Sequence, residues 1–179
     1  TGYIIGFNVK PDNVAGFRTA GLDLTLAYRL RTASLGTFNI SLVGNYLDRL
    51  EFVASPGATL DSDRGEQYIP KYSASFDLNW QKGPVTVAYG ITWFSKTDRF
   101  VAEDLAGDPD YSDPRFFKVK EKWEHDLQVG IDVGDRFNVY AGVNNLFDEK
   151  PAFGYASYPV SAMGRYFYTG VKVALGAAK

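Results

Sequence analysis

The sequence contains no cysteine and a single histidine among its 179 residues. The first absence excludes disulfides, zinc–thiolate sites and thiol nucleophiles, and it leaves the redox compartment open. With His125 as the one imidazole, a Ser–His or Cys–His hydrolase has little to build on. We expect a protein that is not an enzyme, with no catalytic residue, metal or cofactor of its own.

A long apolar run and an excess of basic charge are also missing. No stretch of about 18 apolar residues occurs, so no transmembrane helix is expected. The formal net charge of −2 argues against a nucleic-acid partner, because such a surface needs a basic patch. A membrane protein that crosses with strands stays possible, since strands carry a much weaker hydropathy signal.

Alternation of apolar and polar residues is the dominant pattern. In residues 72–81 every even position is apolar or aromatic and every odd position is polar. Successive side chains of a strand point to opposite faces, so this segment predicts a strand with one apolar and one polar face. About ten residues at roughly 3.3 Å each, tilted by roughly 40°, rise about 25 Å, the height of the apolar band of an outer-membrane barrel.

The same alternation recurs along the chain and predicts an all-β, antiparallel fold. The expected strands are residues 3–9, 17–30, 38–53, 72–81, 85–95, 123–133, 137–144 and 166–175. Short connections at residues 31–36, 82–84 and 134–135 alternate with long ones at 54–70, 96–118 and 148–163. Outer-membrane barrels show this asymmetry, with short periplasmic turns and long extracellular loops. A soluble up-and-down barrel with a ligand mouth can show it too.

Aromatic residues stand at both ends of the apolar face, as two membrane interfaces would select. Together with the alternation they predict a transmembrane β-barrel. His125 falls on the same face, where we expect an interfacial role. The row near the long loops is Tyr46, Tyr72, Trp93 and Trp123, and the row near the short turns is Tyr28, Phe38, Trp80 and Phe137.

Charged residues fall on the polar face among many Gly, Ser, Thr and Asn. A charge facing lipid costs about 2–4 kcal/mol at the midplane, so these residues must face water or protein. They could line a channel, pair with one another or contact another domain, and their small neighbours fit a wide lumen. The charged residues are Asp23, Arg29, Asp77, Glu124, Asp126, Asp132 and Lys172.

Two motifs near the carboxyl end, Asn144-Asn145-Leu146-Phe147-Asp148 and Gly164-Arg165-Tyr166, carry a family resemblance. They resemble the end of TonB-dependent outer-membrane receptors, where an Asn-Leu-Phe-Asp motif closes the penultimate strand and a Gly-Arg-aromatic motif begins the last. Residues 16–24 are similar to a strand start of the same family. We expect the motif residues to be fold and assembly signals. They are Asn144, Asn145, Leu146, Phe147 and Asp148 in the first motif, and Gly164 and Arg165 in the second.

The resemblance implies that residues 1–179 are the C-terminal portion of the barrel, the last eight strands of about 22. The plug domain and the N-terminal strands would lie on another chain or a missing segment. The sequence opens on a strand pattern without a signal peptide, so we expect a processed chain or a fragment. It ends Leu175-Gly176-Ala177-Ala178-Lys179, without the usual final aromatic.

The implied function is import across the outer membrane of a Gram-negative bacterium. The cargo would be a large, scarce nutrient: a ferric siderophore first, or cobalamin, a glycan or a peptide. The implied partners are outer-membrane lipid, the imported ligand, and the TonB complex acting through the plug. Two alternatives stay open, namely a self-contained eight-stranded outer-membrane barrel for adhesion or structure, and a soluble ligand-binding β-barrel.

Ligand contacts are expected in the long loops, because loops placed by a rigid scaffold carry function. The acidic residues 103–113 lack the glycine and glutamate that an EF-hand needs, so no calcium site is expected there. The candidate ligand residues combine charge or an aromatic face with an exposed segment: Arg64, Glu66, Tyr68, Tyr111, Arg115, Tyr155 and Tyr158.

Overall fold

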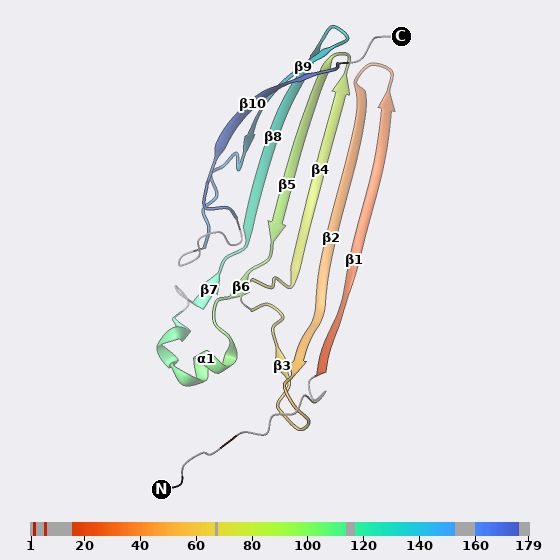
Figure 1. Cartoon of the computed structure of the whole chain (residues 1–179). Helices are drawn as coiled ribbons and strands as arrows, with labels where there is room; N and C mark the ends of the chain where they lie inside the picture. The colour runs from red at the N-terminus through yellow and green to blue at the C-terminus, as the bar shows by residue number, and fades with distance from the viewer. Residues whose placement is uncertain are drawn as a thin grey trace.

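Long antiparallel strands dominate the computed structural model, which describes residues 2, 6, 16–66, 68–113, 117–152 and 160–175 (Figure 1). The all-β class is confirmed, and every predicted strand after the first is present. The predicted strand at residues 3–9 lies outside the described residues. The main strands are β1 (Gly16–Thr32), β2 (Gly36–Val53), β4 (Tyr72–Lys82), β5 (Val85–Phe94), β8 (Lys122–Val133), β9 (Phe137–Asn144) and β10 (Tyr166–Val173).

The long connections contain short elements that alternation did not predict. Strand β3 (Asp61–Ser62) pairs with β2, and β6 (Thr97–Asp98) pairs with β7 (Lys118–Val119) in a separate ribbon. Between β6 and β7 lie helix α1 (Ala102–Gly107) and the 3₁₀ turn η1 (Pro109–Ser112). None of the helices in the described residues has the length and apolar character needed to span a membrane.

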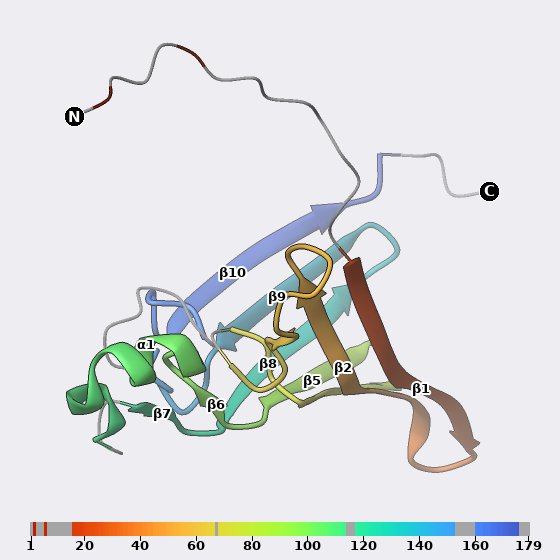
Figure 2. The same ribbon diagram turned by 90° about the horizontal axis from the view of Figure 1, so that it is seen from below.

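The main sheet is a meander with the order β1-β2-β4-β5-β8-β9-β10, and β3 adds an eighth strand beside β2. The short turns gather at one end and the long connections with α1 at the other (Figure 1). We term the latter the outer end. Seen along the strands, the sheet traces an open arc (Figure 2). Within the described residues β1 and β10 do not pair, so the arc is not closed.

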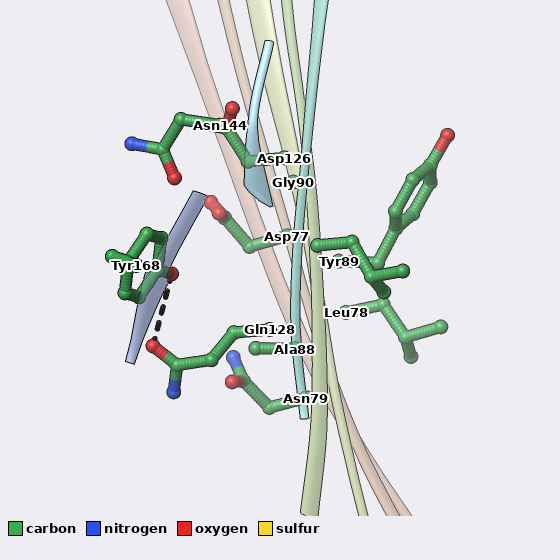
Figure 3. A pocket seen from close by; sticks show the side chains of 11 residues that line it. Asp77, Leu78, Asn79, Ala88, Tyr89, Gly90, Asp126, Gln128, Asn144 and Tyr168 are labelled. Atoms are coloured by element: carbon green, nitrogen blue, oxygen red, sulfur yellow. Dashed lines mark hydrogen bonds between the residues drawn. The ribbon is translucent and has the colours of Figure 1, made fainter. Parts of the chain in front are cut away.

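The register of the sheet separates an apolar face from a polar one. Leu42 lies opposite Leu26 and Phe76, while its neighbour Ser41 lies opposite Ala27 and Asp77. Directly opposed residues share a face, so each apolar row runs unbroken across the strands. The separation is visible where Leu78 and Tyr89 point to one side of the ribbon while other labelled side chains point to the other side (Figure 3).

The apolar face has no protein partner among the described residues. Leu22 is 71% exposed, Leu24 60% and Phe167 76%. Few apolar side chains are buried in the described part, and they do not form the core of a sandwich. They are Val119, Val143, Ala152 and Val160. Because a soluble barrel or sandwich would bury its apolar rows in a dry core, this surface indicates contact with lipid.

The polar face lies on the inside of the arc. Tyr168 of β10 donates a hydrogen bond to Gln128 Oε1 of β8 at 3.1 Å, passing over Gly142 of the intervening β9. Side chains two strands apart converge on the concave side of a curved sheet and diverge on the convex side. Tyr140 lies equally close to β10, where a Cβ at Gly170 would stand 2.3 Å from its Oη. The polar face therefore lines the interior.

Both predicted aromatic rows are present on the apolar face. Tyr46 stacks on Tyr72 with ring centroids 5.1 Å apart near the outer end. At the opposite end Phe38 meets Trp80 at 6.5 Å, and Trp80 Nε1 donates to the Leu35 carbonyl at 2.7 Å. From Phe38 to Tyr46 the strand rises about 26 Å along its length, or roughly 20 Å at a tilt of roughly 40°. That rise fits the apolar band of a membrane barrel.

We predict that the two faces of β2 differ sharply in their tolerance of charge. Leu42→Arg places a guanidinium midway between the aromatic rows and should cost about 2–4 kcal/mol. Ser41→Arg places the same group on the inner face opposite Asp77 and should cost little. Urea titration of the protein in lipid vesicles measures both changes. Equal destabilisation by the two variants would contradict the assignment of the faces.

Candidate functional site

The long connections pack together at the outer end. The Asp98 amide donates to the Gly65 carbonyl at 2.7 Å, and Glu66 forms a parallel bridge with Asp98, so the β3–β4 connection is joined to the β6–β7 ribbon. Thr97 and Val119 of that ribbon are each 2% exposed. The outer loops thus have a small buried core, which fixes the positions of polar groups around it.

A basic pocket lies beside this core, where the β7–β8 segment meets the segment after β9. Three lysines of this segment, Lys118, Lys120 and Lys122, line the pocket together. Trp93 Nε1 donates to Glu121 Oε2 at 3.3 Å, which places Glu121 with the outward aromatic residues, whereas Lys122 of β8 alternates with outward Trp123 and lies on the inner side. The lining residues are Arg99, Lys118, Val119, Lys120, Lys122, Pro151 and Ala152.

The pocket has a surplus of positive charge. Lys118 forms an ion pair with Asp98, and Lys122 forms one with Glu149. Lys120 makes no ion pair among the residues that the structure describes. The lining of the pocket thus includes four basic side chains and no carboxylate. A concave site lined by one sign of charge concentrates its field, so this pocket is suited to an anionic ligand.

Sequence reasoning did not select these lysines. The usable signal was the run Lys118-Val119-Lys120-Glu121-Lys122, in which three cations recur with a period of two at the start of a strand. The contact of Lys122 with Glu149 joins residues far apart in the chain, so the pocket itself could not be read from local sequence.

Four of the predicted ligand residues lie in the part of the chain that the structure describes. Arg64 Nη1 donates to the Asp48 carbonyl at 2.8 Å on the rim, and Glu66 lies at the bridge with Asp98. Tyr68 is 54% exposed, and Tyr111 stacks on Phe100 at 4.5 Å. None of these four lines the basic pocket. Arg115, Tyr155 and Tyr158 lie outside the described residues, so their predicted role stays a prediction.

A second hollow lies on the inner wall, midway along the strands, and it is acidic (Figure 3). Its lining includes Asp77 and Asp126 beside the amides of Asn79 and Gln128. Asp126 Oδ1 accepts a hydrogen bond from the Asn145 amide at 2.8 Å. The described part of the chain holds no group of three or more His, Asp and Glu side chains placed to bind a metal.

Several of the predicted inward charges are held by neutral neighbours on the same face. Asn45 Nδ2 donates to Asp23 Oδ1 at 2.6 Å, and Asn138 Nδ2 donates to Asp132 Oδ1 at 2.7 Å. The Lys172 ammonium lies 5.4 Å from the centroid of the Tyr140 ring. Neutral amides and rings hold these charges without cancelling them, so the wall stays polar and charged.

His125 lies on the apolar face, as predicted. Its Nδ1 is 2.7 Å from Tyr89 Oη, and its ring meets the edge of Phe147 at a centroid distance of 4.9 Å. Phe147 thus lies on the same outward face, with 67% of the residue exposed. The imidazole belongs to an aromatic cluster near the outer interface and does not face a cavity.

The first carboxyl-terminal motif forms a closed turn. Asn145 is 3% exposed and has a left-handed backbone with φ of 52°. Its side chain bonds both ways to Glu149: Nδ2 donates to the carbonyl at 2.8 Å, and Oδ1 accepts from the amide at 2.7 Å. Leu146 N donates to the His125 carbonyl at 2.6 Å, which anchors the turn to β8.

The second motif docks onto the first through Asp148. The Asp148 carboxylate accepts hydrogen bonds from Lys150 Nζ at 2.8 Å and from the Arg165 amide at 3.0 Å. Lys150 first, and then the Arg165 amide, lower the pKa of the Asp148 carboxyl. Gly164, at φ +68°, packs so closely that a Cβ would stand 2.7 Å from Asp148 Oδ1. We term these contacts the Asp148 clasp, and they hold the start of β10 against the end of β9.

Comparison with known proteins identifies the family to which this sequence is similar. Residues 3–146 match the family described as TonB dependent receptor-like, beta-barrel. A comparison with curated protein sequences gave no match. Similar solved structures include a mutant of the ferric enterobactin receptor PfeA from Pseudomonas aeruginosa (18% identity), another mutant of it in complex with enterobactin (18%) and PfeA in complex with BCV-L6 (17%).

Each of these three alignments has a TM-score of 0.54 and covers 87% of this chain and 22% of the receptor. The likeness shows the barrel fold, and the chain spans about a fifth of the length of these receptors.

We predict that Asp148→Ala opens the clasp at neutral pH. The Arg165 amide loses its acceptor, so its protection against hydrogen exchange should fall roughly threefold to tenfold, as for one hydrogen bond. Because the pKa of the folded carboxyl is lowered, the contact is present at neutral pH and is lost as the pH falls through that lowered value. Hydrogen-exchange mass spectrometry measures both effects.

Asp135→Ala, in the short turn at the opposite end, is the matched control and should leave Arg165 protected. Unchanged protection in Asp148→Ala would show that the clasp does not hold the strand.

Proposed function

Because this chain belongs to the TonB-dependent receptor β-barrel family, we propose that it forms part of the wall and outer mouth of a transporter for a ferric siderophore. The family is one of outer-membrane receptors and transporters rather than enzymes. The proposal places the chain in the outer membrane of a Gram-negative bacterium. Its apolar rows would face lipid and its polar rows the lumen.

The observation that carries the choice of ligand is the basic pocket. A pocket at the mouth of the lumen that is lined by four basic side chains and no carboxylate favours an anionic cargo over uncharged ones. Ferric tris-catecholate complexes are anionic, because three doubly deprotonated catecholates exceed the charge of the ferric ion, whereas many glycans carry no charge for the pocket to recognise. The similarity in fold to ferric enterobactin receptors supports the same class.

We further propose that residues 1–179 supply the C-terminal strands of a barrel of about 22 strands. The unpaired outer edges of β1 and β10 within the described sheet, and the small share of the receptor length that is covered, support this. The inner wall would then face a plug domain, through which the TonB complex acts. A closed eight-stranded barrel would need β1 to pair with β10, which the described strands do not do.

The test is uptake of iron-55 by cells that carry the intact receptor, with ferric enterobactin, an anionic tris-catecholate complex, as the probe. We expect the double variant Lys120→Gln and Lys122→Gln to reduce uptake at limiting concentration by at least about tenfold. A cationic ferric hydroxamate complex serves as the comparison and should not lose uptake through this change.

Lys172→Gln with Lys82→Gln is the control, because both lysines lie away from the pocket and the charge change is equal. Wild-type cells that take up no ferric chelate would refute the proposed cargo. Equal losses for the anionic and cationic complexes would refute the role given to the pocket.

A further inference from the structure

Basic residues gather on the outward side of β1 and β2, just beyond the aromatic row. Positions of one face recur with a period of two, so Arg18 shares the outward face with Ala20 and Leu22. Arg49 is the partner of Ala20 and therefore faces outward as well. These residues lie at the outer end, where the strands leave the apolar band.

A β-bulge produces this arrangement. The register shifts between Ala20 and Gly21: Gly21 pairs with Leu47 and Ala20 with Arg49, so Asp48 is the extra residue. Without the shift, Arg49 would share the inner face with Leu47. The bulge thus turns a guanidinium toward the lipid side.

Lys71, the residue before β4, completes the group. Its ammonium lies 5.8 Å from the centroid of Tyr46 and 5.5 Å from that of Tyr72, over the stacked outward pair. Lys71 forms no ion pair with any residue that the structure describes. Aromatic faces hold the cation in position and leave its charge available.

Carboxylates cancel half of the positive charge. Asp48 Oδ2 is 3.5 Å from Arg49 Nε, and Asp48 Oδ1 is 3.7 Å from Arg64 Nη1. Glu51 is the Cα partner of Arg18. Four cations with two carboxylates leave a surplus of two on a chain whose net charge is −2. The side chain of Arg49 is 60% exposed and can turn to an external anion.

The height of the group matches that of lipid headgroups. Tyr46 and Arg49 pair with Leu22 and Ala20, which are two residues apart on β1. Arg49 therefore lies about 7 Å beyond Tyr46 along the strand, or roughly 5 Å along the membrane normal. Aromatic girdles lie at the edge of the hydrocarbon, and the headgroup layer beyond it is roughly 5–8 Å deep. The cations therefore stand beside phosphates, while Leu22 and Leu24 below them meet acyl chains.

We infer that Arg18, Arg49 and Lys71 form a binding site on the outer surface for the phosphate of a membrane lipid headgroup. Basic residues at the interface attract anionic lipids, and the tyrosine pair adds contact area beneath the phosphate. The site rests on the outer-membrane location in the proposed function, and it is independent of the cargo carried. It would fix one lipid at the junction of β1, β2 and β4.

The test measures lipid affinity of the intact receptor in detergent micelles by native mass spectrometry. The probe is lipid A carrying both phosphates, compared with the dephosphorylated form. In the triple variant Arg18→Gln, Arg49→Gln and Lys71→Gln, affinity for the phosphorylated lipid should fall at least about tenfold. Affinity for the dephosphorylated lipid should be unchanged.

The control triple is Arg29→Gln, Arg31→Gln and Lys172→Gln, which removes three cations from the inner face. It should bind the phosphorylated lipid as the parent does, and heat-modifiable gel migration verifies that both triples are folded. Equal binding of the two lipids by the parent protein, or an equal loss in both triples, would overturn the site. The experiment does not measure iron uptake. Its result therefore tests the lipid site even if the transport proposal fails.

Discussion

The two-residue period of a strand, locked in register across the sheet, is the constraint from which the other features follow. A slip of one residue between β2 and β4 would place Asp77 in lipid and Phe76 in the lumen. Lipid offers no hydrogen-bonding partner to the backbone, so the strands must pair completely within the membrane. The same paired register therefore satisfies the backbone hydrogen bonds and separates the outward apolar side chains from the inward polar ones.

That sorting gives three chemically distinct surfaces. The inner wall is polar and includes the acidic hollow around Asp77 and Asp126, while the mouth above it is basic around Lys120. The outward face is apolar up to the aromatic row and basic beyond it. The outer loops are tied to the sheet by specific contacts, of which the Asp148 clasp and the Lys122–Glu149 ion pair are the clearest.

Sequence patterns predicted the strands, their faces, the aromatic rows and the family, because each depends on residues close together in the chain. They did not predict β3, the β6–β7 ribbon or the basic pocket, which depend on pairings between distant segments. The bulge at Asp48 was not predicted either, because one extra residue changes the pattern of a long alternating segment very little. The loop residues were chosen by chemical type alone, and Arg64 and Tyr111 proved to serve separate local contacts.

The central claim is that the apolar face of the sheet touches lipid tails. Because the chain has no cysteine, single cysteines can be introduced along residues 73–80 of the intact membrane-embedded protein and labelled with a nitroxide. Spin-label relaxation by oxygen, which concentrates in lipid, and by a water-soluble nickel complex reports the surroundings of each site. The account predicts oxygen maxima at Ala74, Phe76 and Leu78 and nickel maxima at Ser75, Asp77 and Asn79. A flat profile, or maxima with the opposite phase, would contradict it.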